Sequence, residues 1–148
     1  MPVQLTRRAL LRTSFMLGAG LAIPVGRACE IETGILVIRH PWTRATRPGE
    51  TTAILCMSFE QVTEPDRLIG AESPVATGAA MGGTAAGPVV DFPIPAGRES
   101  ALAEDGAYVL LTGLRHPLGL GREYPLQLTF ERSGIALAQL SVDFPAAG

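Results

Sequence analysis

Hydrophobic and polar residues alternate with a period of two in several short runs after residue 28, and no run keeps the 3.6-residue period of a helix. In residues 51–59, Ala53, Leu55, Met57 and Phe59 share one face. The opposite face of this run is also largely apolar, so we expect a strand in the centre of a sheet.

The run 124–131 alternates in the same way and turns Leu126, Leu128 and Phe130 inward. A turn at residues 132–134 then leads to a last strand. Further strand-like runs cover 34–39, which Pro41 is expected to end, 67–72, 89–94 as an edge segment, 99–103, 107–112 and 135–144. About seven to nine short strands separated by turn residues predict an all-β fold, an antiparallel Greek-key β-sandwich.

Residues 78–87 consist almost entirely of Ala and Gly, with Met81 as their one large side chain. Such a segment can bury little side-chain area, so we expect a surface loop that leaves Met81 exposed.

Residues 1–28 have the features of a cleaved export signal. Arg7, Arg8 and Arg12 precede a hydrophobic run at 13–25 that is too short to span a bilayer. Residues 6–12 (TRRALLR) fit a twin-arginine pattern, with general secretion or an uncleaved anchor as alternatives. We therefore expect one periplasmic domain at 29–148, without a transmembrane segment.

Two cysteines, Cys29 and Cys56, could pair in an oxidising compartment. We favour a buried Cys56 on a strand and an unpaired thiol at a mobile new terminus. Lipidation of Cys29 is a further alternative, although Gly26 and Arg27 are poor lipobox residues.

The charge balance narrows the possible functions. Residues 29–148 contain eight Arg, no Lys and fourteen acidic residues, which gives a net charge of −6. An acidic domain without Lys has no electrostatic footprint for nucleic acid or an anionic membrane. The chain also lacks a G-x-S-x-G motif, paired catalytic carboxylates and a phosphate-binding Gly loop, so we do not expect an enzyme.

Isolated polar residues offer few candidate sites. His40 and His116 each stand beside a Pro, and we expect structural or surface roles for them. Trp42 and Arg44 share one face of an extended segment, where stacking or an ion pair with Asp66 is expected.

Six short sequence motifs occur along the chain in a fixed order and spacing. They are 40–46 (HPWTRAT), 48–49 (PG), 66–76 (DRLIGAESPVA), 94–97 (IPAG), 114–118 (LRHPL) and 125–131 (PLQLTFE) with Gly134. In order and spacing, over about residues 34–142, they resemble the PCu(A)C periplasmic copper chaperones. The resemblance implies a single cupredoxin-like β-sandwich that hands Cu(I) to the copper centre of a respiratory oxidase. A Sco-like protein or a cytochrome oxidase subunit would be its partner.

The same resemblance implies where copper ligands would lie. The family binds Cu(I) through a His, a Met and a later His-x-Met pair, and such soft ligands suit this ion. The first His position falls on Met81, the first Met falls within 88–91, and the pair falls on Tyr108 and Leu110. Met81 is therefore the one candidate ligand, and we expect it to lie near Tyr108 and Leu110 at one end of the sandwich.

Three functional interpretations follow. The first is a copper-chaperone-like protein with a degenerate site. The second is a paralogue that binds no metal and acts as a periplasmic protein–protein interaction module. The third is a purely structural sandwich.

Overall fold

The computed structural model describes residues 30–147, which form strands and no helix. The strands are β1 (Glu30–Glu32), β2 (Val37–Arg44), β3 (Thr52–Glu60), β4 (Asp66–Glu72), β5 (Gly78–Gly83), β6 (Phe92–Ile94), β7 (Ser100–Leu102), β8 (Ala107–Thr112), β9 (Glu123–Phe130) and β10 (Gly134–Phe144). The all-β expectation is confirmed, and the strands predicted from alternation lie within one or two residues of β3, β4, β8, β9 and β10.

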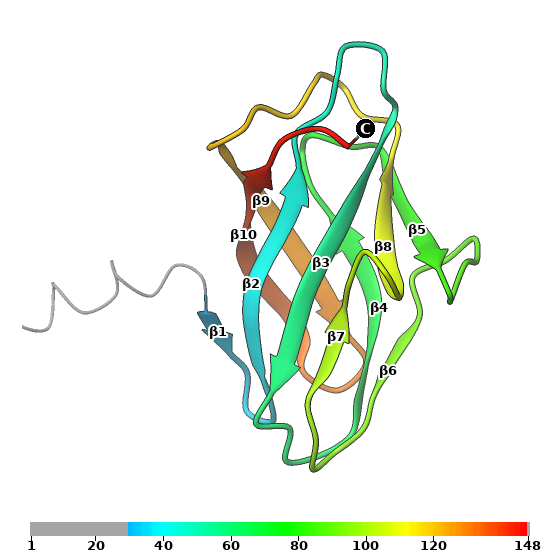
Figure 1. Cartoon of the computed structure of the whole chain (residues 1–148). Coiled ribbons are helices and arrows are strands. Elements are labelled where there is room, and N and C mark those ends of the chain that lie inside the picture. The colour runs from blue at the N-terminus through cyan, green and yellow to red at the C-terminus, as the bar shows by residue number, and fades with distance from the viewer. Residues whose placement is uncertain (1–29, 148) are drawn as a thin grey trace, which may run out of the picture.

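The strands follow one path, β5-β8-β3-β2-β10-β9-β4-β6, with β1 joined to β2 and β7 joined to β3. The path curls so that β2, β3 and β7 lie in front of β9 and β4 (Figure 1). The result is a single β-sandwich, as expected. One pair departs from the antiparallel expectation, because β10 runs parallel to β2, with Ser141 opposite Trp42.

Large apolar side chains fill the space between the layers. The predicted inward residues of β3 and β9 are all at most 6% exposed: Ala53, Leu55, Met57, Phe59, Leu126, Leu128 and Phe130. The rings of Phe59 and Phe130 meet edge to face, with centroids 6.0 Å apart. Strand alternation therefore identified the core correctly.

The prediction that Pro41 ends a strand is wrong. β2 continues through Pro41, and its pairing with β3 shifts register between Arg39 and Trp42. His40 has a φ of 53° at this irregularity. A bulge of this kind removes Pro41 from the hydrogen-bond ladder, so its missing N–H leaves no gap there.

The predicted surface loop at 78–87 is also wrong for most of its length. β5 pairs with β8 at every residue from Gly78 to Gly83. On its other edge, Met81 exchanges two backbone hydrogen bonds with Gly87, of 3.0 and 3.1 Å. Backbone pairing on both edges makes a strand out of a segment with little side-chain surface.

The predicted export signal at 1–28 and Cys29 lie outside the described residues. Within residues 30–147, the structure contains no helix long and apolar enough to cross a membrane.

Candidate functional site

The one candidate copper ligand lies in the core. Met81 is 4% exposed and stands opposite Val109 of β8, which is fully buried. Its side chain belongs to the same hydrophobic cluster as Leu55 and Leu111. The expectation that Met81 is an exposed loop residue is therefore wrong, although its role towards copper stays a prediction.

Tyr108 and Leu110 point to the other face of the sheet. Residues alternate along a strand, so these two share a face that neither Val109 nor Met81 shares. Their cross-strand partners are Gly82 and Ala80. The expected neighbourhood of Met81, Tyr108 and Leu110 is thus correct for the backbone, but the pleat separates the side chains.

The Tyr108 ring covers Gly82 and Gly83 of β5. A Cβ atom added to Gly82 would lie 2.4 Å from Cε1 of Tyr108, so the ring occupies the space of the missing side chain. Tyr108 as a whole is half-buried. An aromatic residue opposite an edge glycine supplies contact area that the glycine lacks.

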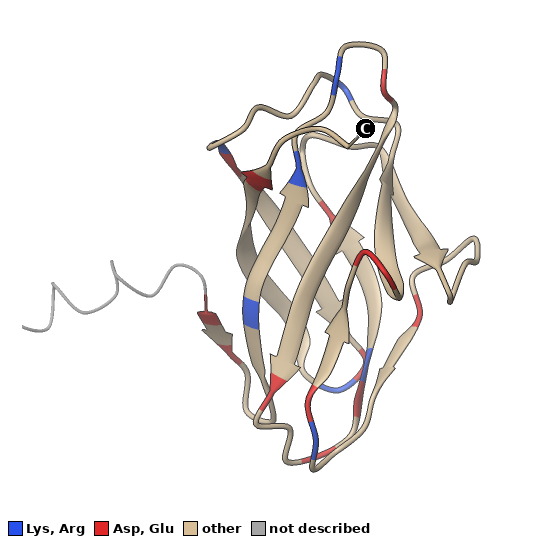
Figure 2. Ribbon diagram, viewed as in Figure 1, with Lys and Arg blue, Asp and Glu red and all other residues tan. Residues whose placement is uncertain are grey.

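This outer face offers poor chemistry for Cu(I). Leu110 has Ala80 on one side and Ile54 of β3 on the other, so its row is entirely apolar. Neither β5 nor β8 carries a charged residue (Figure 2). A phenol is a harder ligand than a thioether or an imidazole, so the residues present do not fit a tight Cu(I) site. Residues 30–147 also contain no group of three His, Cys, Asp or Glu side chains arranged to hold a metal.

Cys56 is the one thiol that the structure describes. It lies on β3 opposite Trp42 and is fully buried, as the favoured interpretation expected. Burial, with a further contribution from Glu104, raises the pKa of this thiol to about 12. The thiolate that would bind a metal is therefore strongly disfavoured. Pairing with Cys29 concerns a residue outside the described part of the chain.

Both histidines have structural neighbours. His40 Nε2 lies 2.5 Å from Oδ2 of Asp143, which joins β2 to β10. His116 Nδ1 lies 2.9 Å from the Pro117 carbonyl oxygen, and its ring lies 5.8 Å from that of Tyr124. The expectation of surface or structural roles agrees with these contacts.

The expected ion pair between Arg44 and Asp66 is wrong. Arg44 instead pairs with Glu104 and lies over the ring of Phe144, 5.3 Å from its centroid. Trp42 packs edge-on against the same ring, with centroids 4.8 Å apart. The expected stacking is therefore present, with Phe144 at its centre.

Asp66 has a different role, in the turn after β9. Its carboxylate accepts hydrogen bonds from the backbone N–H groups of Arg67, Arg132 and Ser133 and from the Ser133 hydroxyl, at 2.7–3.1 Å. Burial alone would raise the pKa of Asp66, but these donors stabilise the charged form and lower the pKa below its ordinary value.

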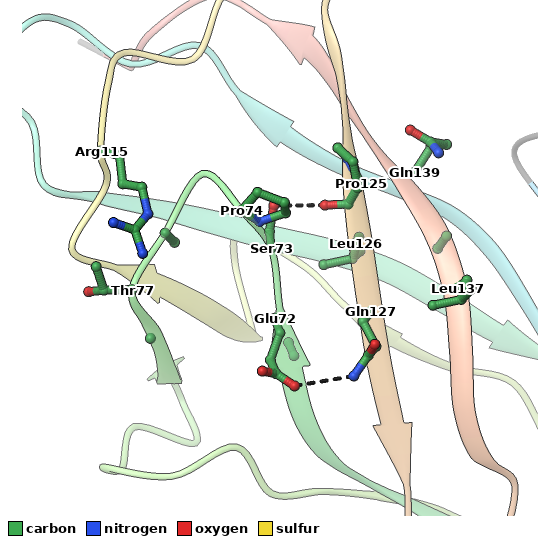
Figure 3. Close-up of a pocket in the computed structure, with 14 residues that line it drawn as sticks. Glu72, Ser73, Pro74, Thr77, Arg115, Pro125, Leu126, Gln127, Leu137 and Gln139 are labelled. Atoms are coloured by element: carbon green, nitrogen blue, oxygen red, sulfur yellow. Dashed lines mark hydrogen bonds between the residues drawn. The ribbon is translucent and has the colours of Figure 1, made fainter.

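Sequence reasoning missed one feature, a groove of about 630 Å³ beside the linker from β4 to β5. Arg115, Glu72 and Leu137 are among the residues that line it (Figure 3). They come from separate parts of the chain, so no local motif marked them.

A family model described as LpqE-like matches residues 36–143. Among solved structures, the copper-bound PCuAC domain from PmoF2 is 29% identical with a TM-score of 0.71, covering 78% of this chain and 98% of that one. The apo PCuAC domain from PmoF1 is 28% identical, also at 0.71, covering 78% and 99%. Cu(I)-bound DR1885 from Deinococcus radiodurans, 23% identical with a TM-score of 0.62 and covering 83% and 85%, is similar in fold. No curated protein matches the sequence.

Proposed function

Because the chain belongs to the LpqE-like family and has the fold of PCuAC domains, we propose that it is a periplasmic, copper-chaperone-like protein whose own Cu(I) site is degenerate. Its place would be beside the copper centre of a respiratory oxidase, with a Sco-like protein or an oxidase subunit as partner. We assign no catalytic step to this chain.

The pairing of β5 with β8 supports the proposal that the Cu(I) site is degenerate. A Cu(I) ion on the outer face would meet Tyr108 and Leu110, while the Met81 thioether faces the core. Cu(I) prefers two or more soft ligands, and this face supplies none of them. Wild-type protein should therefore lose Cu(I) to a competing chelator.

A Cu(I) competition titration of the exported domain, residues 29–148, tests this directly. Tyr108→His with Leu110→Met restores the His-x-Met pair on one face, and Ala80→Met adds a thioether opposite position 110. We expect the triple variant to bind Cu(I) at least about 100-fold more tightly than wild type. The matched control has Ala80→Leu in place of Ala80→Met in the triple variant, which adds similar bulk without sulfur.

Two outcomes would contradict the proposal. Tight Cu(I) binding by wild type would mean that the site is not degenerate. No gain by the triple variant would mean that these outer-face positions cannot approach one ion, which removes the structural basis for the assignment.

A second candidate function is a protein–protein interaction module that needs no metal. Three of the exposed large apolar side chains, Ile69, Ile135 and Leu137, lie on strands β4 and β10, which flank β9. Binding of the purified domain to a Sco-like protein or an oxidase subunit, measured with and without a copper chelator, separates the two functions. Binding that survives the chelator favours the module, and binding that requires Cu(I) favours the chaperone.

Export through the twin-arginine route is part of the proposal, and residues 6–12 (TRRALLR) support it. Replacing Arg7 and Arg8 by Lys should leave precursor in the cytoplasm, because the receptor recognises the guanidinium pair and not only the charge. Cell fractionation measures this. Unchanged export of the double variant would contradict the twin-arginine assignment.

A further inference from the structure

The groove beside the β4–β5 linker is built from four parts of the fold. The first part is the end of β4 and the start of the linker, with Glu72, Ser73 and Pro74. Strand β9 contributes Pro125 and Gln127, and β10 contributes Leu137 and Gln139. The fourth part is the segment after β8, which contributes Arg115. Figure 3 shows Arg115 and Thr77 on one side, Leu137 and Gln139 on the other, and Ser73 and Pro74 between them.

Hydrogen bonds hold the walls of this groove in place without a ligand. The Ser73 hydroxyl donates to the Pro125 carbonyl oxygen at 2.7 Å, which ties the linker to β9. Gln127 Nε2 donates to Oε2 of Glu72 at 3.2 Å, which ties β9 to the end of β4. The backbone N–H of Arg115 donates to the Val75 carbonyl oxygen at 2.9 Å. A groove formed in advance loses little conformational entropy on binding.

Charge is distributed unevenly along the groove. Arg115 is exposed, and its guanidinium has no acidic partner among residues 30–147, although the domain is acidic overall. An unpaired guanidinium in a concave site is a ready partner for a carboxylate. The remaining oxygens of Glu72 and Gln127 are free to accept hydrogen bonds from backbone N–H groups of a ligand.

Apolar side chains also line the groove. Leu137 is 73% exposed, and the rings of Pro74 and Pro125 are among the other lining residues. A carboxylate-binding end, an apolar patch and nearby acceptors together match an extended peptide that has an acidic group and one aliphatic side chain.

We propose that this groove binds a short extended peptide segment, with a carboxylate against Arg115 and an aliphatic side chain against Leu137. The carboxylate belongs either to an Asp or Glu side chain or to a chain terminus. This inference does not depend on the copper function.

The test uses the ¹⁵N-labelled domain, residues 29–148, and the peptide acetyl-Ala-Leu-Ala-Ala-Glu with a free C-terminus. We expect saturable NMR shifts at Thr77, Arg115 and Gln127, with a Kd of about 0.1–1 mM, since a short flexible peptide loses much entropy on binding. An amidated peptide and a Glu-to-Gln peptide identify the carboxylate that is used. The peptide with both changes should bind at least about tenfold more weakly.

Variants on the protein side complete the test. Arg115→Ala and Leu137→Asp should each weaken binding by about tenfold, and both positions are exposed, so the fold should persist. Arg98→Ala, at an exposed Arg outside the groove lining, should bind as wild type does. The absence of saturable shifts, an equal loss in the Arg98 variant, or equal binding of the doubly neutral peptide would overturn the proposal.

Discussion

Two antiparallel strand pairs of this sandwich differ in how their faces are determined. In β9–β10, the inward residues include Leu128 and Phe130, and polar residues alternate with them. In β5–β8, the edge strand has the sequence GAAMGG, and Met81 is its one large side chain. Both pairs have continuous backbone registers.

The difference shows where the choice of face comes from. In β9 the side chains themselves favour one face, because turning the strand over would expose three large apolar groups, Leu126, Leu128 and Phe130, and bury polar ones. In β5 the Ala and Gly residues have little preference, so pairing with β8 and the burial of Met81 decide the face. The variants below test this contrast in order of decreasing effect.

The largest effect is expected in β9. Phe130→Ala removes a ring that is 2% exposed and contacts Phe59, so unfolding should require about 3–5 kcal/mol less free energy. Urea denaturation measures it. The control Leu137→Ala, on the exposed face of β10, should change stability by less than about 0.5 kcal/mol. A loss below about 1 kcal/mol for Phe130→Ala would contradict its place in the core.

The next largest loss of stability is expected in the turn between β9 and β10. Asp66→Ala leaves the N–H groups of Arg132 and Ser133 without their acceptor, and should lower stability by about 2–3 kcal/mol at neutral pH. Comparison of urea midpoints measures this loss, and wild-type stability in the variant would contradict the role of Asp66 in the turn.

The same carboxylate gives a pH dependence. The pKa of Asp66 is lowered in the folded state, so the unfolded chain binds the proton more readily. This contribution to stability is complete above the unfolded pKa of about 4 and is lost as the pH falls through the lower folded pKa. Asp66→Asn should therefore show a flatter stability curve below about pH 5. An unchanged acid limb in that variant would contradict the assignment.

Most of the fold could be predicted from the sequence, because strands such as β3 and β9 carry their own alternation. β2 could not be followed past Pro41, since a bulge is visible only when both strands are paired. Tyr108 and Leu110, which the family resemblance makes ligand positions, lie together on β8, but the opposite facing of Met81 depends on the β5–β8 register. The groove at Arg115 assembles from distant segments, and no local pattern encodes it.

A smaller effect is expected at the end of β5. Gly83 has a φ of +69°, and a Cβ atom there would lie 1.9 Å from the Gly106 carbonyl oxygen. Gly83→Ala should therefore lower stability by about 2 kcal/mol, from backbone strain and displacement of that carbonyl. The matched control is Gly106→Ala, where a Cβ atom meets nothing within 4 Å. Equal stability of the two variants would show that this corner adjusts freely.

The smallest effect is expected at Met81, where it separates a core residue from a copper ligand. Met81→Leu keeps the volume of the side chain and removes its sulfur. If Met81 only fills the core beside Val109, stability should change by less than about 1.5 kcal/mol, and residual Cu(I) binding should not change. Thermal unfolding and the chelator competition give these two values independently.

A different combination of stability and Cu(I) binding in Met81→Leu would indicate that Met81 is a copper ligand. Unchanged stability with lost residual Cu(I) binding would mean that the core opens at β5 to present the thioether, because a buried sulfur cannot otherwise reach an ion. Met81→Ala provides the scale, since a cavity at this site should lower stability by about 2–5 kcal/mol. The weak alternation of β5 makes such opening easier there than at β9, where turning Leu128 and Phe130 outward would expose far more apolar surface.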